Sequence, residues 1–63
     1  MSEKDLMLEF NATVRSYNEQ CEYNGKKEGT EYIKHLVHNA ELIQYFLRRY
    51  CKKEVSFDRY PMA

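Results

Sequence analysis

The chain has 63 residues, with ten Lys and Arg against ten Asp and Glu, and its formal net charge is zero. A chain of this length has room for one domain, so the sequence predicts a single unit over residues 1–63 that buries only about 60% of its unfolded surface. Zero net charge removes the long-range field that would draw the chain to DNA, RNA or an anionic membrane. Any contact with nucleic acid therefore has to be local.

Cysteine content and hydropathy predict a cytoplasmic protein. The chain has two cysteines, no apolar run of the signal-peptide type and no stretch of about 18 apolar residues that would cross a membrane. Six tyrosines and three phenylalanines are many for this length. Tyrosine is enriched at interfaces because it covers a large area at low entropy cost, so the composition favours a binding protein.

An amphipathic helix is predicted from about residue 2 to about residue 24. Ser2 and Asp5 resemble a capping box, in which the Ser2 hydroxyl accepts a hydrogen bond from the backbone three residues later. Apolar residues then recur at spacings of three and four and form one face of the helix: Met7, Phe10, Val14, Tyr17 and Cys21. This face needs a second element to cover it.

A second amphipathic helix is predicted from about residue 30 to about residue 53. A turn at about 24–29 precedes it, with an Asn24–Gly25 pair, and Thr30 follows as the N-cap. The helical spacing is kept by Ile33, Leu36, Ala40, Ile43, Leu47 and Tyr50. Asn-Gly is also a strong β-hairpin signal, but the flanking residues keep the helical period instead of alternating. We therefore expect an αα-hairpin in which facing positions sum to about 54.

Residues 54–63 lose the helical pattern. Val55 and Phe57 alternate with polar residues, and Pro61 stops regular structure. The segment is predicted to be an extended tail. Either Phe57 and Tyr60 dock it onto the hairpin, or it is a short linear motif that becomes ordered only on a partner.

The predicted fold is therefore all-α, a two-helix antiparallel hairpin with a short extended C-terminal tail. The apolar face of the second helix is wider than one helix covers, since it also includes Tyr32, Val37, Phe46 and Cys51. Burying a large apolar side chain is worth roughly 1.5–3 kcal/mol, so we expect the hairpin to self-associate into a helical bundle. In size and plan the chain resembles small plasmid and phage regulators that dimerise as helical hairpins, an analogy of architecture and not of motif.

One polar triplet has the spacing of a metal site. Glu31, His35 and His38 follow one another at i, i+4 and i+7, on one face of the second helix. A real site needs a fourth ligand and supporting hydrogen bonds, and the sequence indicates neither. We expect a solvated polar face here, with no metal and no cofactor.

No group of residues has a catalytic signature. Cys21 and Cys51 lie on or beside the apolar seam, where a thiol is usually a small buried hydrophobe with a raised pKa. The carboxylates are scattered, no Gly-rich loop is present, and two helices offer little concavity to desolvate an acid. The sequence predicts a protein that is not an enzyme.

A second stripe on the second helix lies about half a turn away from the apolar seam. It contains His38, Leu42, Tyr45 and Arg49, with Arg48 beside them. Aromatic, aliphatic and guanidinium groups together are typical of binding hot spots, so we expect this stripe to bind another protein. The alternative is ordinary surface, where single exposed Leu and Tyr residues are common.

Basic residues gather at the end of the second helix. The cluster consists of Arg48, Arg49, Lys52 and Lys53, with Tyr45 and Tyr50 interleaved. Cations at this end complement the helix dipole, and the hairpin sets them beside Glu3 and Asp5. The alternative is a site in which Tyr50, Lys52 and Lys53 contact an anion, a nucleotide or RNA.

Together these features favour a small non-enzymatic regulatory or inhibitory protein of the kind that phages, plasmids and other mobile elements encode. Such a protein acts by binding another protein through the faces of its second helix. The alternative is an oligomeric hairpin that binds RNA or a small phosphorylated nucleotide through its basic, tyrosine-rich helix end. A phosphate binder forms a salt-dependent complex, which separates the two hypotheses.

Overall fold

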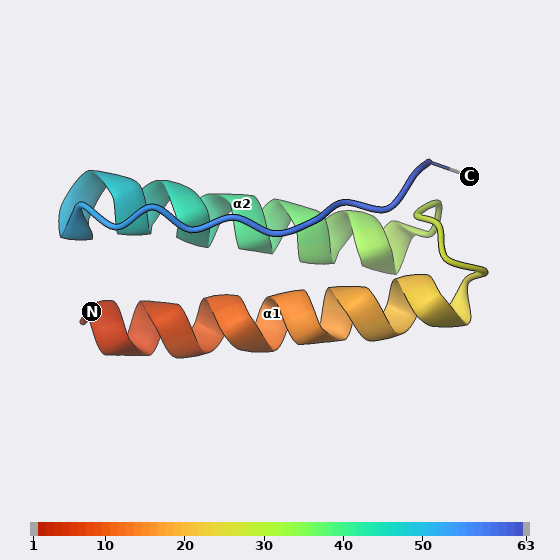
Figure 1. The fold of residues 1–63 in the computed structure, drawn as a ribbon, viewed down its shortest axis with the longest axis horizontal. Helices are drawn as coiled ribbons and strands as arrows, with labels where there is room; N and C mark the ends of the chain where they lie inside the picture. Colours follow the sequence, from red (N-terminus) through yellow and green to blue (C-terminus); the bar gives the residue numbers. More distant parts are fainter. Residues whose placement is uncertain (1, 63) are drawn as a thin grey trace.

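Two antiparallel helices of equal length form the hairpin, and the C-terminal segment returns along them in an extended conformation (Figure 1). The computed structural model describes residues 2–62, with α1 at Glu3–Tyr23 and α2 at Glu31–Cys51. The predicted all-α hairpin with an extended tail is confirmed, and each helix end lies within two residues of its expected position. The predicted domain also includes Met1 and Ala63, which lie outside the described residues.

Side-chain caps explain where both helices begin. The Ser2 hydroxyl accepts a hydrogen bond from the Asp5 N–H at 3.1 Å, and the Thr30 hydroxyl accepts one from the Ile33 N–H at 3.1 Å. Each bond satisfies one of the free N–H groups in a first helical turn. α2 ends at Cys51, and its C-cap Lys52 has a left-handed φ of 55° that turns the chain back toward the hairpin.

The loop between the helices depends on left-handed residues and on one amide side chain. Gly25 has a φ of 77° and Lys26 a φ of 62°. The Asn24 side chain donates a hydrogen bond to the Lys27 carbonyl at 3.0 Å, which holds the loop closed. Asn-Gly thus serves a helix–helix connection in this chain, although the pair is better known from β-hairpins.

The core consists of two neighbouring clusters between the helices. The cluster near the helix ends contains Leu6, Phe10, Ala40, Ile43 and Leu47. The cluster near the loop contains Tyr17, Cys21, Ile33, Leu36 and Val37. In both clusters the residue numbers of facing α1 and α2 positions sum to about 54, as predicted for the antiparallel hairpin. The predicted apolar seams are therefore confirmed. Tyr50 was predicted to lie on the apolar seam but is 69% exposed, because it faces the first turn of α1, where few side chains are available to cover it.

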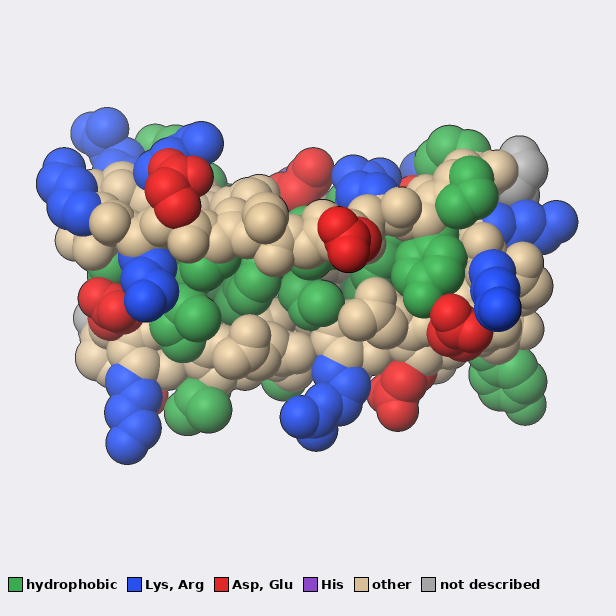
Figure 2. All heavy atoms as spheres, viewed as in Figure 1, with side chains coloured by type: hydrophobic (Ala, Val, Ile, Leu, Met, Phe, Trp, Pro, Cys, Tyr) green, Lys and Arg blue, Asp and Glu red, His purple; other side chains and the backbone are tan. Residues whose placement is uncertain are grey.

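The tail, residues 54–62, lies in the groove between α1 and α2 along one side of the hairpin. Val55 packs on the cluster near the helix ends, and Phe57 packs on both clusters. Apolar side chains fill the space between α1 and the tail (Figure 2). Of the two alternatives for the tail, docking is confirmed.

Docking of the tail changes the argument for self-association. Val37 belongs to the apolar residues that a second copy was expected to cover, yet it lies in the cluster on which Phe57 and Tyr60 pack. The tail therefore acts as a third core element on that side. Tyr32, which is 54% exposed, remains uncovered. Within residues 2–62 neither helix is long and apolar enough to cross a membrane.

Candidate functional site

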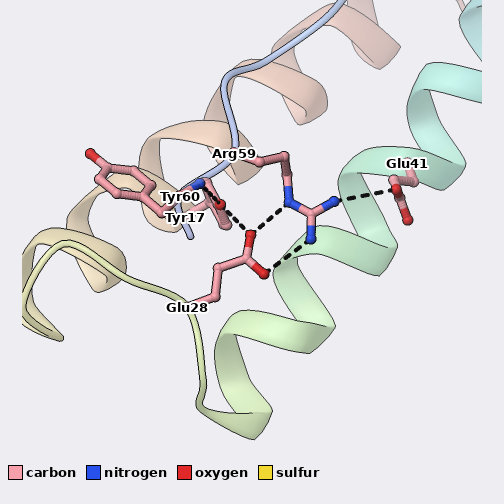
Figure 3. A network of polar contacts seen from close by, with 5 residues as sticks. All are labelled: Tyr17, Glu28, Glu41, Arg59 and Tyr60. Carbon is pink, nitrogen blue, oxygen red and sulfur yellow. Dashed lines mark hydrogen bonds and ion pairs between the residues drawn. The ribbon is translucent and has the colours of Figure 1, made fainter. Parts of the chain in front are cut away.

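A buried carboxylate in the loop organises the contact between the hairpin and the tail. Glu28 is only 4% exposed. The Arg59 guanidinium donates two hydrogen bonds to it, from Nε at 2.6 Å and from Nη2 at 3.0 Å, and the Tyr17 hydroxyl donates another (Figure 3). The chain thus brings together a loop acid, a tail cation and a phenol from α1. We call these three residues the latch.

The charges in the latch explain the protonation states of its groups. Hydrogen bonds from Arg59 hold the pKa of the Glu28 carboxyl below its ordinary value, although burial acts in the opposite direction. The same contact raises the pKa of Arg59. Both groups are therefore charged at neutral pH, as a bidentate arginine–carboxylate pair requires. Arg59 also lies 3.6 Å from the Glu41 carboxylate on α2, so one tail residue reaches both the loop and α2.

Tyr17 links the latch to the backbone of the tail. Its hydroxyl accepts a hydrogen bond from the Tyr60 N–H at 2.8 Å while donating to Glu28. Burial, together with the hydrogen bond to Glu28, raises the pKa of Tyr17 to about 12. The Glu28 N–H donates to the Pro61 carbonyl at 2.8 Å, and the Tyr60 hydroxyl donates to Glu22 at 2.7 Å. The last residues of the tail are therefore fixed by both main-chain and side-chain hydrogen bonds.

The chemistry of the latch is that of a structural contact. Its carboxylate is ionised and already accepts three hydrogen bonds, so it is poorly suited to act as a general base. Every described buried side-chain N or O atom of the chain has a hydrogen-bond partner. The arrangement therefore holds the tail in place on the hairpin.

Within residues 2–62, the predicted partner-binding stripe lies on the outer side of α2, and Leu42 at its edge also lines a hollow toward α1. Leu42 and Tyr45 are each 45% exposed, and His38, Arg48 and Arg49 are exposed. The stripe is therefore accessible, which a binding site requires. Its function as a binding site stays a prediction.

Aromatic rings extend this stripe toward the end of α2. The Tyr45 and Phe46 ring centroids are 5.8 Å apart, and those of Phe46 and Tyr50 are 6.0 Å apart. The Arg49 guanidinium carbon lies 5.9 Å from the Tyr50 ring centroid, within cation–π range. Three rings and a guanidinium thus occupy one continuous surface of the last two turns of α2.

The basic end of α2 is only partly neutralised. Lys53 Nζ lies 3.9 Å from the Glu3 carboxylate, which confirms that the hairpin sets this end beside the acidic start of α1. Within residues 2–62, Arg48, Arg49 and Lys52 form no salt bridge. Lys and Arg side chains gather at this end of the molecule (Figure 2). Contact of Tyr50, Lys52 and Lys53 with an anion stays a prediction.

The polar triplet lies on the surface, and the two thiols lie in or beside the core. Among the described residues, no group of three or more His, Cys, Asp and Glu side chains is placed to hold a metal ion, so Glu31, His35 and His38 remain a surface row. Cys21 is fully buried, and burial raises the pKa of its thiol. Cys51 is half-buried, and both cysteines are free.

Sequence reasoning identified the aromatic half of the tail contact and missed its charged half. Phe57 and Tyr60 were the residues named for a docked tail, one of the two alternatives, and both pack on the hairpin. Glu28 and Arg59 were not expected, because each is a single charge in a stretch rich in charges. The one usable signal was Tyr17, since a tyrosine inside an apolar seam needs a hydrogen-bond partner for its hydroxyl.

The fold and this site define a helical hairpin whose groove is filled by its own C-terminal segment. Comparisons of the chain with protein-family models, with curated proteins and with solved structures find no match.

Proposed function

We propose that this protein is a small non-enzymatic regulator or inhibitor that acts in the cytoplasm by binding another protein through the stripe His38, Leu42, Tyr45, Arg48 and Arg49. It is of the kind that phages, plasmids and other mobile elements encode. The observation that carries the proposal is the exposure of Leu42 and Tyr45, each at 45%, on the side of α2 that neither α1 nor the tail covers.

The chemistry of this surface suits a protein partner better than a nucleic acid. Tyr45 belongs to a run of ring contacts, and Arg49 lies over the ring of Tyr50. Aromatic residues and arginine dominate the energetics of protein interfaces, because they bury a large area and pair with planar groups. The net charge of zero supplies no general attraction for a phosphate backbone.

The test is capture of proteins from the native cell by the wild type and by two double variants. Leu42→Ser with Tyr45→Ser removes the centre of the stripe. Leu8→Ser with Tyr23→Ser removes the same two side-chain types from α1, where they are 60% and 91% exposed. We expect all three proteins to have the same helicity and melting temperature, and the stripe variant alone to lose a protein that the other two capture.

Three outcomes contradict the proposal in different ways. Equal capture by both double variants means that the stripe is ordinary surface. A stripe variant that loses melting temperature together with capture means that the stripe stabilises the fold or an assembly. Capture of RNA that disappears as salt is raised, and that depends on Lys52 and Lys53, favours the basic end as a phosphate site.

A further inference from the structure

The side of the hairpin opposite the tail has an open hollow between the two helices. Its floor is formed by Leu6 and Ile43 and its α2 wall by Leu42 and Phe46, with a volume of about 430 Å³. A second hollow shares Leu6 and Phe46 with the first and extends it to Tyr50. We call this continuous surface the open groove. It lies on the half of the face near the helix ends, and toward the loop its lining becomes polar.

The two sides of the hairpin differ because the tail occupies only one of them. On α1, Val14 and Glu22 line the tail side, whereas Glu9 and Thr13 line the open groove. At about 100° per residue, these pairs lie on opposite flanks of the buried seam. The open groove is thus the counterpart of the groove that the tail fills, but no segment within residues 2–62 occupies it.

Opposite charges border the open groove at the end of the hairpin where α1 begins and α2 ends. Asp5 and Glu9 lie on its α1 rim. On α2, Arg49 follows Phe46 by three residues, and its guanidinium lies over the ring of Tyr50, which lines the groove. The antiparallel register sets Arg49 level with Asp5 and one turn from Glu9. In the part of the chain that the structure describes, Asp5, Glu9 and Arg49 form no salt bridge. One rim is therefore acidic, the other is basic, and neither is neutralised.

This charge arrangement is self-complementary under only one kind of two-fold symmetry. An axis parallel to the helices places the α1 rim of one copy against the α2 rim of the other, with Arg49 facing the turn between Asp5 and Glu9 in both halves. An axis perpendicular to the helices places each rim against the same rim of the second copy and separates the opposite charges along the bundle. An interface of this kind is isologous, so each favourable contact is made twice.

We propose that the open groove binds a second copy of this chain, with the two-fold axis parallel to the helices, so that Glu9 of each copy pairs with Arg49 of the other. Phe46 of each copy then enters the hollow of the other. The product is a four-helix bundle in which every pair of neighbouring helices is antiparallel, the arrangement that helix dipoles favour. Tyr45 and His38 remain at the outer corners of the bundle.

Charge reversal across the two rims tests this arrangement. Glu9→Lys and Arg49→Glu each place like charges together at both contacts of a homodimer. An equimolar mixture of the two variants restores opposite charges at both contacts of the heterodimer. Glu19→Lys is the matched control, because it makes the same substitution at an exposed position of α1 away from the groove. All the substituted residues are exposed, so the hairpin is expected to remain folded by circular dichroism.

The readout is sedimentation from micromolar to millimolar protein, with native mass spectrometry to identify the heterodimer. We expect the wild type and Glu19→Lys to dimerise alike, and each groove variant to dimerise at least about tenfold more weakly, since like charges in an interface are strongly unfavourable. The mixture is expected to regain wild-type affinity as a heterodimer. A wild type that stays monomeric throughout overturns the proposal, and so does a mixture that stays monomeric. Loss of protein capture after Tyr45→Ser tests the stripe separately.

Discussion

The contact between Glu28 and Arg59 predicts a strong energetic coupling between the loop and the tail. We expect Glu28→Gln and Arg59→Gln each to lower the free energy of unfolding. The double variant should lower it by clearly less than the sum of the two single effects. Each single change leaves one charged group facing a neutral amide in a partly desolvated site, whereas the double change removes both charges. The matched control is the pair formed by Glu31 and Lys34, on the surface of the same molecule.

The expected magnitude follows from the burial of the two partners. The Glu28 side chain is 6% exposed and that of Arg59 is 44% exposed, so water reaches the guanidinium but hardly the carboxylate. Breaking a fully buried pair costs about 3–5 kcal/mol, and partial access of water reduces this, so we expect about 2–3 kcal/mol for Arg59→Gln and a coupling energy of about 1–2 kcal/mol. Glu31 and Lys34 are 84% and 70% exposed, and their coupling should be below about 0.5 kcal/mol.

Denaturant unfolding followed by circular dichroism measures both cycles. A coupling between Glu28 and Arg59 as small as that of the control pair would refute the reasoning. pH supplies a second check, because the folded-state pKa of Glu28 lies below the ordinary value of 4.5. A lowered carboxyl pKa stabilises the fold above the unfolded-state pKa, and this contribution is lost as pH falls through the folded-state pKa. The stability difference between wild type and Glu28→Gln should therefore shrink below about pH 4.5.

Three further substitutions test the core, the tail and the helix end in denaturant unfolding. Leu47→Ala should lower the free energy of unfolding by about 2–5 kcal/mol, because it leaves a cavity at a fully buried position. The control Lys34→Ala should lower it by less than about 0.5 kcal/mol. Equal effects of the two changes would mean that the wrong face has been assigned to the core. Phe57→Ala should cost about 2–4 kcal/mol and speed amide exchange at Tyr60, since Phe57 packs on both clusters. Lys52→Gly should raise the free energy of unfolding by about 0.5–1 kcal/mol, because glycine accepts a φ of 55° without steric cost. A lower free energy of unfolding would show instead that the Lys52 side chain stabilises the turn.

The parts of the fold that depend on local sequence were predictable. Caps at Ser2 and Thr30 act over three residues, and apolar spacing defines a helix face within a few turns. The turn was also predictable, because two glycines interrupt the helical period between two amphipathic segments. From these signals alone the hairpin and its register follow.

The latch was not predictable because its partners lie far apart in the chain. Arg59 contacts Glu28 across 31 residues, and the Tyr60 N–H reaches Tyr17 across 43. No periodicity relates a charge in a loop to a charge in a tail, and side chains such as Lys27 look equally available in the sequence. Only the direction of the docked tail selects the pair. For the same reason the sequence could not show that the tail, and not a second chain, covers Val37.

The docked tail also limits how far the proposed self-association can proceed. With one groove filled by its own tail, each copy has one open groove, so a two-fold pair uses every site and closes. If the latch is released by Arg59→Gln at elevated temperature, the groove beneath Phe57 opens on the other side. A copy with two unfilled grooves can contact two neighbours, and we expect species larger than a dimer to appear in light scattering. Arg59→Gln samples that remain dimeric while Phe57 loses its protection from exchange would show that the two grooves are not equivalent. The open groove has an acidic and a basic rim, whereas the tail side has Glu22 on α1 and Glu41 on α2. Opposite charges on the two rims would then decide which groove accepts a second copy.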